Sequence, residues 1–231
     1  MKLMKFGATL LALSAALTMM AQAEFINGDF QTGDLTGWTQ FTTANGSIGQ
    51  PLGYPNVVLF NTNGSGDSLA AHFNVGEVVL TVLQEGGGIG QFVNLSAGSH
   101  VLTADIASVD DPEGPNAAAG LFTLLVNGTA AGSTDLGPFS MVTQTLRGAL
   151  NVSFSVPTDG SYDLQIEITR PFLGGSSDLM TPQQYLDNVH VTGSVITTPE
   201  PSSFSLLVFA AIGVLILFPQ HRRLKGPDPI P

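Results

Sequence analysis

The chain has 231 residues, of which 43% are hydrophobic and 11% charged, with 27 glycines and 14 prolines. Its length predicts one domain with appendages. The apolar content excludes a disordered chain, and the absence of cysteine excludes a disulfide scaffold and any cysteine-ligated zinc or iron–sulfur site. Lys and Arg number 7 against 18 Asp and Glu, which is the wrong sign of charge for binding nucleic acid.

The cationic residues are concentrated at the two ends of the chain. The first five residues hold Lys2 and Lys5, and the last ten hold Arg222, Arg223 and Lys225. Residues 24–199 contain all but two of the 18 acidic residues and just two arginines, Arg147 and Arg170. Short basic ends around an acidic body are typical of a chain that meets a membrane at both ends.

Residues 1–23 have the pattern of a secretory signal peptide. Lys2 and Lys5 form a positive region, Leu10–Met20 is apolar, and Ala21-Gln22-Ala23 is a small-residue cleavage site before Glu24. A permanent anchor is the alternative, but the apolar run is short for a membrane span. We therefore expect the body of the protein to leave the cytoplasm.

A second apolar run, Phe204–Phe218, lies near the other end of the chain. Eleven of its 15 residues are Leu, Ile, Val or Phe, which favours membrane insertion by about 3 to 7 kcal/mol. The sequence predicts a transmembrane helix over residues 204–221 and a basic cytoplasmic tail over 222–231. A buried core helix is the alternative, but no polar face interrupts the run.

Between the ends, residues 24–196 read as short strands and turns. Tyr162 to Thr169 and Val152 to Val156 alternate apolar and polar residues, as half-buried strands do. Leu121–Val126 followed by Asn127-Gly128 predicts a hairpin, and Val78–Leu83 and His100–Ser108 read as further strands. The run Gly86-Gly87-Gly88-Ile89-Gly90 reads as a flexible connection. The pattern predicts an all-β sandwich or barrel.

The segment before the C-terminal apolar run carries a more specific pattern. Pro199-Glu200-Pro201, then a short span, then Arg222-Arg223, resembles the PEP-CTERM sorting signal, with residues 197–203 as the linker that carries the motif. The resemblance implies an exosortase-type processing enzyme as partner, in Gram-negative bacteria that make exopolysaccharide and biofilm matrix. It also implies a protein anchored in the inner membrane until processed and then found at the cell surface or outside the cell.

The body carries a second resemblance at its two ends. It opens with Phe25-Ile26-Asn27-Gly28-Asp29-Phe30 leading to Gly37-Trp38, and it closes with Tyr185-Leu186-Asp187-Asn188-Val189-His190-Val191. These patterns resemble jelly-roll modules of the carbohydrate-binding, galactose-binding-like kind. The resemblance implies a jelly-roll β-sandwich over residues 24–196.

Asp187 is the unusual residue of the closing pattern. By the period of two it shares a face with Tyr185, Val189 and Val191, and a buried lone carboxylate is costly unless it is paired or bound to a cation. The resembled family holds a structural calcium at this place, which implies Asp187 and, as a weaker neutral ligand, Gln31 as metal ligands. The alternative is an Asp187 that is hydrogen-bonded to backbone amides of the first strand.

No catalytic motif stands out. There is no G-x-S-x-G and no H-E-x-x-H, and His72, His100 and His190 have no metal-ligand spacing. A glycoside hydrolase, whose two carboxylates need meet only in space, is a remote alternative. Sugar binding needs an exposed aromatic ring; Trp38, Tyr162 and Tyr185 read as core residues, which leaves Tyr54 as the predicted sugar contact.

These observations predict a non-catalytic exported protein of the cell surface or extracellular matrix, sorted by its C-terminal signal and associated with exopolysaccharide or biofilm. The alternative is a carbohydrate-binding module that recognises exopolysaccharide.

Overall fold

The computed structural model describes residues 24–49, 53–110, 118–174 and 181–193. The chain divides into two compact units, Met1–Ile196 and Thr197–Pro231, and the second lies outside the described residues. The first unit has a hydrophobic core of its own, so it is able to fold by itself.

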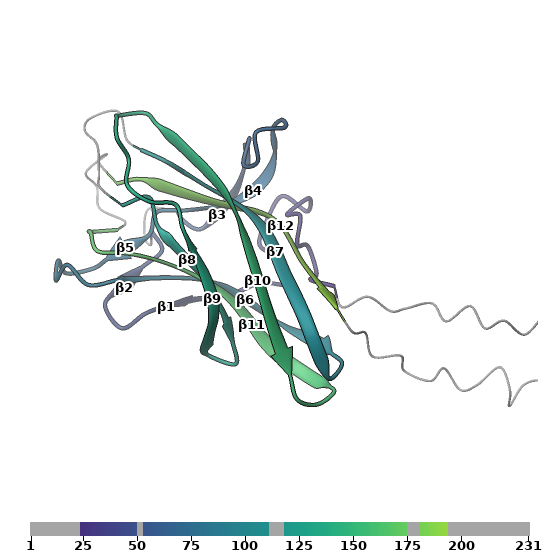
Figure 1. Ribbon diagram of the computed structural model, residues 1–231. Helices are drawn as coiled ribbons and strands as arrows, with labels where there is room; N and C mark the ends of the chain where they lie inside the picture. The colour runs from purple at the N-terminus through teal and green to yellow at the C-terminus, as the bar shows by residue number, and fades with distance from the viewer. Residues whose placement is uncertain (1–23, 50–52, 111–117, 175–180, 194–231) are drawn as a thin grey trace, which may run out of the picture. The chain divides into compact units, whose positions relative to one another are not determined.

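Two antiparallel five-stranded sheets form this unit (Figure 1). Sheet A has the order β1 (Thr39–Thr42), β6 (Glu85–Leu95), β11 (Gly160–Arg170), β8 (Leu121–Val126) and β9 (Thr129–Asp135). Sheet C has the order β10 (Thr145–Val156), β7 (Gly98–Val109), β12 (Gln183–Gly193), β4 (Ser68–Phe73) and β3 (Asn56–Phe60). A short ribbon pairs β2 (Gly46–Ser47) with β5 (Gly76–Glu77).

The core lies between the two sheets. Along β11 the side chains of Tyr162, Leu164, Ile166 and Ile168 point inward, and sheet C contributes residues such as Leu102. From β6 to β12 the chain crosses repeatedly between the sheets, as in a jelly roll. The described residues contain no helix. The prediction of an all-β sandwich is therefore confirmed.

The hairpin predicted at Asn127-Gly128 joins β8 to β9. Asn127 has φ 49° and Gly128 has φ 76°, the pair of positive angles that a type I′ turn requires. Of the four Asn-Gly pairs in the body, this one alone has both residues at positive φ.

The opening segment contains no strand before β1; it is a series of turns that packs on the end of the core. The rings of Phe25 and Phe30 stack on Trp38 at centroid distances of 5.1 and 5.7 Å. Trp38 and Tyr162 belong to the buried core, so their prediction as core residues is confirmed. Tyr185 is buried too, but it is not part of the cluster packed between the two sheets.

The prediction of a strand at Val78–Leu83 is wrong. These residues form the loop between β5 and β6, and five of the six are large aliphatic residues that are 56–69% exposed. An apolar run with high β-propensity forms a strand only where a neighbouring strand pairs with it, and no strand pairs with this run among the described residues.

The prediction of a flexible connection at Gly86–Gly90 is also wrong. These residues are the buried first half of β6, which pairs with β1 on one side and β11 on the other. The neighbouring backbones approach closely: a Cβ atom on Gly88 would lie 1.8 Å from the carbonyl oxygen of Ile166. Glycine is needed here because the adjacent strand leaves no space for a side chain.

The predicted signal peptide, sorting motif and C-terminal helix lie outside the described residues. Within the part of the chain that the structure describes, no helix is long and apolar enough to cross a membrane.

Candidate functional site: a glycine trough on sheet A

The outer face of sheet A has a trough along β6. Gly90 lies between Thr39 of β1 and Gln165 of β11, and Gly88 lies between Phe41 and Glu167. Since directly paired residues of an antiparallel sheet share a face, these four side chains flank two positions that have none. We call Gly88, Gly90 and their flanking residues the glycine trough.

An exposed aromatic ring stands at one end of the glycine trough. Phe92 follows Gly90 by two residues on β6, is paired with Asp163 and is 74% exposed. A hollow of about 80 Å³ lies beside it, lined by Thr39, Phe41, Gly90, Gln91, Phe92, Asp163 and Gln165. An exposed ring next to a hollow with polar walls can stack on the apolar face of a ligand while the walls donate and accept hydrogen bonds.

Polar side chains of β11 form one wall of the trough. Asp163, Gln165 and Glu167 are half-buried and alternate with the core residues of the strand. The amide Nε2 of Gln165 donates to Asp163 Oδ2 at 2.8 Å, which fixes both groups. From Asp163 to Glu167 this row of polar side chains runs for about 13 Å at ~3.3 Å per residue, and the hollow lies beside Asp163 and Gln165.

The trough is acidic. Burial raises the pKa of Glu167, and the nearby negative charge of Glu85 raises it further. Arg170, the one cation of sheet A among the described residues, is fully buried, and Arg147 belongs to sheet C. The electrostatics therefore disfavour an anionic ligand.

Sequence reasoning missed this site. The alternation of β11 placed Asp163, Gln165 and Glu167 on its wet face, which is confirmed. The sequence did not reveal that the glycine run, residues 86–90, is part of β6, the strand next to β11. This pairing brings Phe92 and Phe41 to the same face of the sheet.

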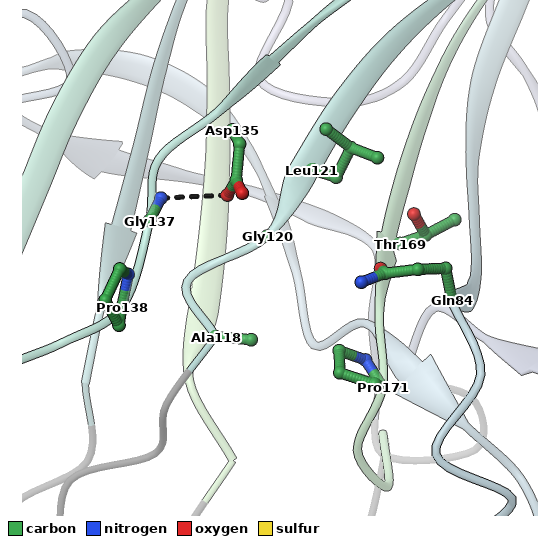
Figure 2. Close-up of a pocket in the computed structure, with 9 residues that line it drawn as sticks. All are labelled: Gln84, Ala118, Gly120, Leu121, Asp135, Gly137, Pro138, Thr169 and Pro171. Atoms are coloured by element: carbon green, nitrogen blue, oxygen red, sulfur yellow. Dashed lines mark hydrogen bonds between the residues drawn. The ribbon is translucent and has the colours of Figure 1, made fainter.

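A second hollow of about 160 Å³ lies at one end of the sandwich (Figure 2). Gln84, Pro138, Pro171 and Asp135 are among the residues around it, and Asp135 Oδ1 accepts a hydrogen bond of 2.8 Å from the amide of Gly137. No aromatic side chain belongs to the described lining, so this hollow has no surface on which a ring-shaped ligand can stack.

The predicted sugar contact, Tyr54, lies by the other sheet. It is half-buried, its ring meets His72 edge-on at a centroid distance of 4.8 Å, and it fills the space beside Gly49. His72 stacks on Tyr185 at 4.6 Å, and Tyr185 stacks on Phe60 at 3.6 Å. The rings thus form a column on the outer face of sheet C.

This aromatic column is tied together by polar contacts. The hydroxyl of Tyr185 donates to Gln183 Oε1 at 2.9 Å, and His72 Nε2 lies 2.8 Å from the same oxygen. Burial, with a smaller effect of Tyr54, raises the pKa of Tyr185 to about 12, and burial lowers the pKa of His72. Because both faces of the Tyr185 ring are occupied, the column offers a ligand less free ring surface than Phe92 does.

The prediction that Asp187 shares the core face with Val189 and Val191 is wrong. A β-bulge between Asp187 and His190 shifts the register of β12 against β7, and Asn188 has φ 50°. Asp187 pairs with Asp105 on the outer face of sheet C, while Leu186 joins the core. The extra residue breaks the period of two on which the prediction depended.

Asp187 is nevertheless almost fully buried, at 1% exposed. Its Oδ2 accepts from the hydroxyl of Ser68 at 2.5 Å, and its Oδ1 accepts from the amide of Asn188 at 2.7 Å. Burial raises its pKa, which Asp105 and Asp29 raise further and the two donors oppose. Its amide partner belongs to its own strand, and not to the first strand as the alternative supposed.

The residues predicted to hold calcium fit that ion only in part. Asp187 and its acidic neighbours would attract a cation, but Gln31 is exposed and its side-chain amide donates to the carbonyl of Asp29 at 3.0 Å. No three His, Asp or Glu side chains within the described ranges converge as metal ligands. Calcium binding stays a prediction, and we derive no function from it.

Comparison with known proteins adds fold-level likenesses. No protein-family model and no curated protein matches the sequence. Among solved structures, a family 61 carbohydrate-binding module in complex with β-1,4-galactotriose has 15% sequence identity and a TM-score of 0.41, over 73% of this chain and 97% of that one. A xylan-binding domain from Paenibacillus barcinonensis has 13% identity and a TM-score of 0.40, over 76% and 97% of the two chains.

A cyclase from Fischerella sp. TAU is similar at the same level, with 15% identity and a TM-score of 0.39 over 74% of this chain and 98% of that one. Because carbohydrate-binding modules and a cyclase are similar to this chain to the same low degree, these similarities do not identify a function.

Proposed function

We propose that this domain binds a polysaccharide chain along the glycine trough of sheet A. The observation that carries the proposal is Phe92, which is 74% exposed beside a hollow whose walls include Asp163 and Gln165. An aromatic ring stacks on the apolar face of a sugar, and carboxylate and amide groups bond its hydroxyls. The row of polar side chains from Asp163 to Glu167, about 13 Å long at ~3.3 Å per residue, suits several linked sugars better than a single one.

The charge of the trough narrows the class of ligand. Asp163, Glu167 and Glu85 provide negative charge, and the described part of sheet A has no exposed cation to offset it. Uronic acid polymers such as alginate would be repelled, since like charges across an interface are costly. The proposed ligand is therefore a neutral polysaccharide.

The test is binding of residues 24–196 to xylan, β-glucan, β-galactan and alginate, measured by affinity electrophoresis and calorimetry. We expect binding to at least one neutral polymer and none to alginate. Phe92→Ala is expected to weaken that binding by about tenfold or more, because it removes the stacking surface. Gly90→Ala should also weaken it, since its Cβ would lie 2.7 Å from Gln165 Cγ and would displace that side chain.

Leu59→Ala is the matched control, because Leu59 is 70% exposed on β3 of the other sheet. It should bind as the wild type does. If the Phe92→Ala variant still bound the polysaccharide and the Tyr54→Ala variant did not, the binding site would be the aromatic column and not the glycine trough. Failure to bind any of the neutral polymers would contradict the proposal and favour a structural role in the matrix.

A further proposal concerns export and sorting, and it depends on the sequence alone. Removal of residues 1–23 and recognition of Pro199-Glu200-Pro201 would deliver the domain to the cell surface, where exopolysaccharide occurs. Replacing these three residues by alanine in a host with an exosortase should leave a larger, membrane-retained form on immunoblots. Identical processing of the variant and the wild type would refute the sorting proposal.

A further inference from the structure

The loop between β5 and β6 exposes an unusual amount of apolar surface. Its five aliphatic residues are Val78 (62% exposed), Val79 (64%), Leu80 (56%), Val82 (69%) and Leu83 (60%). In Figure 1 the loop extends outward from the sandwich beside β2 and β5. Single exposed aliphatic residues are ordinary, but five in six consecutive positions form a patch that requires an explanation. We call Val78–Leu83 the apolar tip.

The apolar tip is held in one conformation by Glu77. The carboxylate of Glu77 accepts hydrogen bonds from the amides of Thr81, Val82 and Leu83 and from the hydroxyl of Thr81, at 2.5 to 3.2 Å. Burial tends to raise the pKa of Glu77, but these donors outweigh it and lower the pKa. Val82 has φ 58°, a conformation that a β-branched residue adopts only when its surroundings enforce it.

Asn45 completes the support from the other side of the loop. Its carbonyl accepts from the amide of Val78 at 2.8 Å, and its side chain both accepts from the amide of Val79 and donates to the carbonyl of Val79. With Glu77, it satisfies five of the six backbone amides of the tip. Backbone groups that are satisfied within the protein can enter hydrocarbon without the cost of losing water.

The two carboxylates that flank the tip, Glu77 and Glu85, both accept hydrogen bonds within the protein. Residues 78–84 contain no charged side chain. At the base, Glu77 is fully buried, and the Glu85 carboxylate accepts hydrogen bonds from Thr43 and from the amide of Asn45. The tip therefore presents mainly aliphatic side chains, on a backbone in which five of six amides are bonded within the protein.

We infer that the apolar tip inserts into the hydrocarbon boundary of a lipid bilayer. A protruding tip whose backbone amides are mostly bonded within the protein suits a fluid apolar phase, and the sequence predicts a bilayer-spanning segment at residues 204–221 of the same chain. The domain has no exposed cluster of Lys or Arg, so attraction to anionic headgroups plays no part. Insertion depends on buried apolar area, as for other interfacial segments.

The test uses residues 24–196, which lack the predicted C-terminal span, and vesicles of phosphatidylcholine. The wild type should float with the vesicles in a density gradient. The partition coefficient of the double variant Leu80→Ser/Leu83→Ser should be lower by a factor of about ten or more. Adding phosphatidylglycerol should weaken binding at low salt, because the acidic body is repelled by anionic lipid. In a separate variant, Leu80→Trp, tryptophan emission should shift to shorter wavelength when the vesicles are added.

Leu59→Ser and Leu59→Trp are the controls, since Leu59 is 70% exposed in β3. The first should float as the wild type does, and the second should show no spectral shift. Equal flotation of the wild type and the double variant, with unchanged circular dichroism, would overturn the inference. So would a concentration-dependent dimer that forms without lipid and is lost in the double variant, because it would identify a second copy as the occupant.

Discussion

Replacing Arg170 by methionine is expected to lower the free energy of unfolding by about 3 to 5 kcal/mol. Arg170 is fully buried; its Nε donates to the carbonyl of Ala118 and its Nη1 to the carbonyl of Val75, both at 3.2 Å. Its guanidinium also lies 5.6 Å from the ring centre of Phe172. Burial lowers its pKa to about 10, against the opposing effect of Asp110, so it remains charged at neutral pH.

The loss arises because methionine removes the two Arg170 donors to the carbonyls of Ala118 and Val75, and the positive charge that interacts with the buried carboxyl of Asp110. Urea denaturation would measure it as a lower midpoint at an unchanged slope. Arg147→Met is the matched control; Arg147 is exposed and donates to the carbonyl of Asn61, so we expect a change of about 1 kcal/mol or less.

A second replacement examines the cause. Asp110→Asn in the Arg170→Met background should recover part of the lost stability, since the neutral amide needs no counter-charge. A fully additive double variant would show that Asp110 and Arg170 do not interact, and an Arg170→Met protein as stable as Arg147→Met would contradict the prediction itself.

Replacing Gly88 by alanine is expected to cost about 3 kcal/mol, or to prevent folding. The added Cβ would lie 1.8 Å from the carbonyl oxygen of Ile166 and 2.8 Å from its carbonyl carbon. Both are backbone atoms of β11, the strand that continues the sheet beyond β6, so relief requires the two strands to separate. Thermal unfolding followed by circular dichroism, with the soluble yield, would measure the effect.

Gly160→Ala is the control for the same sheet. Its Cβ would meet just one atom, Cε2 of Tyr162, at an ordinary contact distance of 3.8 Å, so the midpoint should change little. If the Gly88→Ala and Gly160→Ala variants had the same midpoint of thermal unfolding, the first half of β6 would not be a central strand. That result would remove the glycine trough together with the strand.

Several elements were predictable because their signal is local. The alternation of apolar and polar residues along β10 and β11 predicts one buried and one solvent-facing side for each strand, and both strands have this arrangement. Asn127-Gly128 prefers the positive φ angles of a tight hairpin, and the hairpin is there. In the same way, the wet face of β11 supplied three polar residues of the candidate site, though not the site itself.

Other elements depend on contacts between residues distant in sequence. Val78–Leu83 has the composition of a strand, but its amides donate hydrogen bonds to Glu77 and Asn45, and its aliphatic side chains are exposed to solvent. Phe92 is a candidate ligand contact only because β6 lies between β1 and β11. The amino-acid composition of a segment does not reveal which strands pair with it.

The sequence by itself determined the class of fold, because the periodicity of apolar residues decides which faces must be buried. It also assigned Trp38, Tyr162 and Tyr185 to buried positions. The tertiary structure alone decided the face of Asp187, since one extra residue at Asn188 reverses the alternation of β12. It likewise decided that a glycine run is a central strand, because the close approach of a neighbouring backbone requires glycine there.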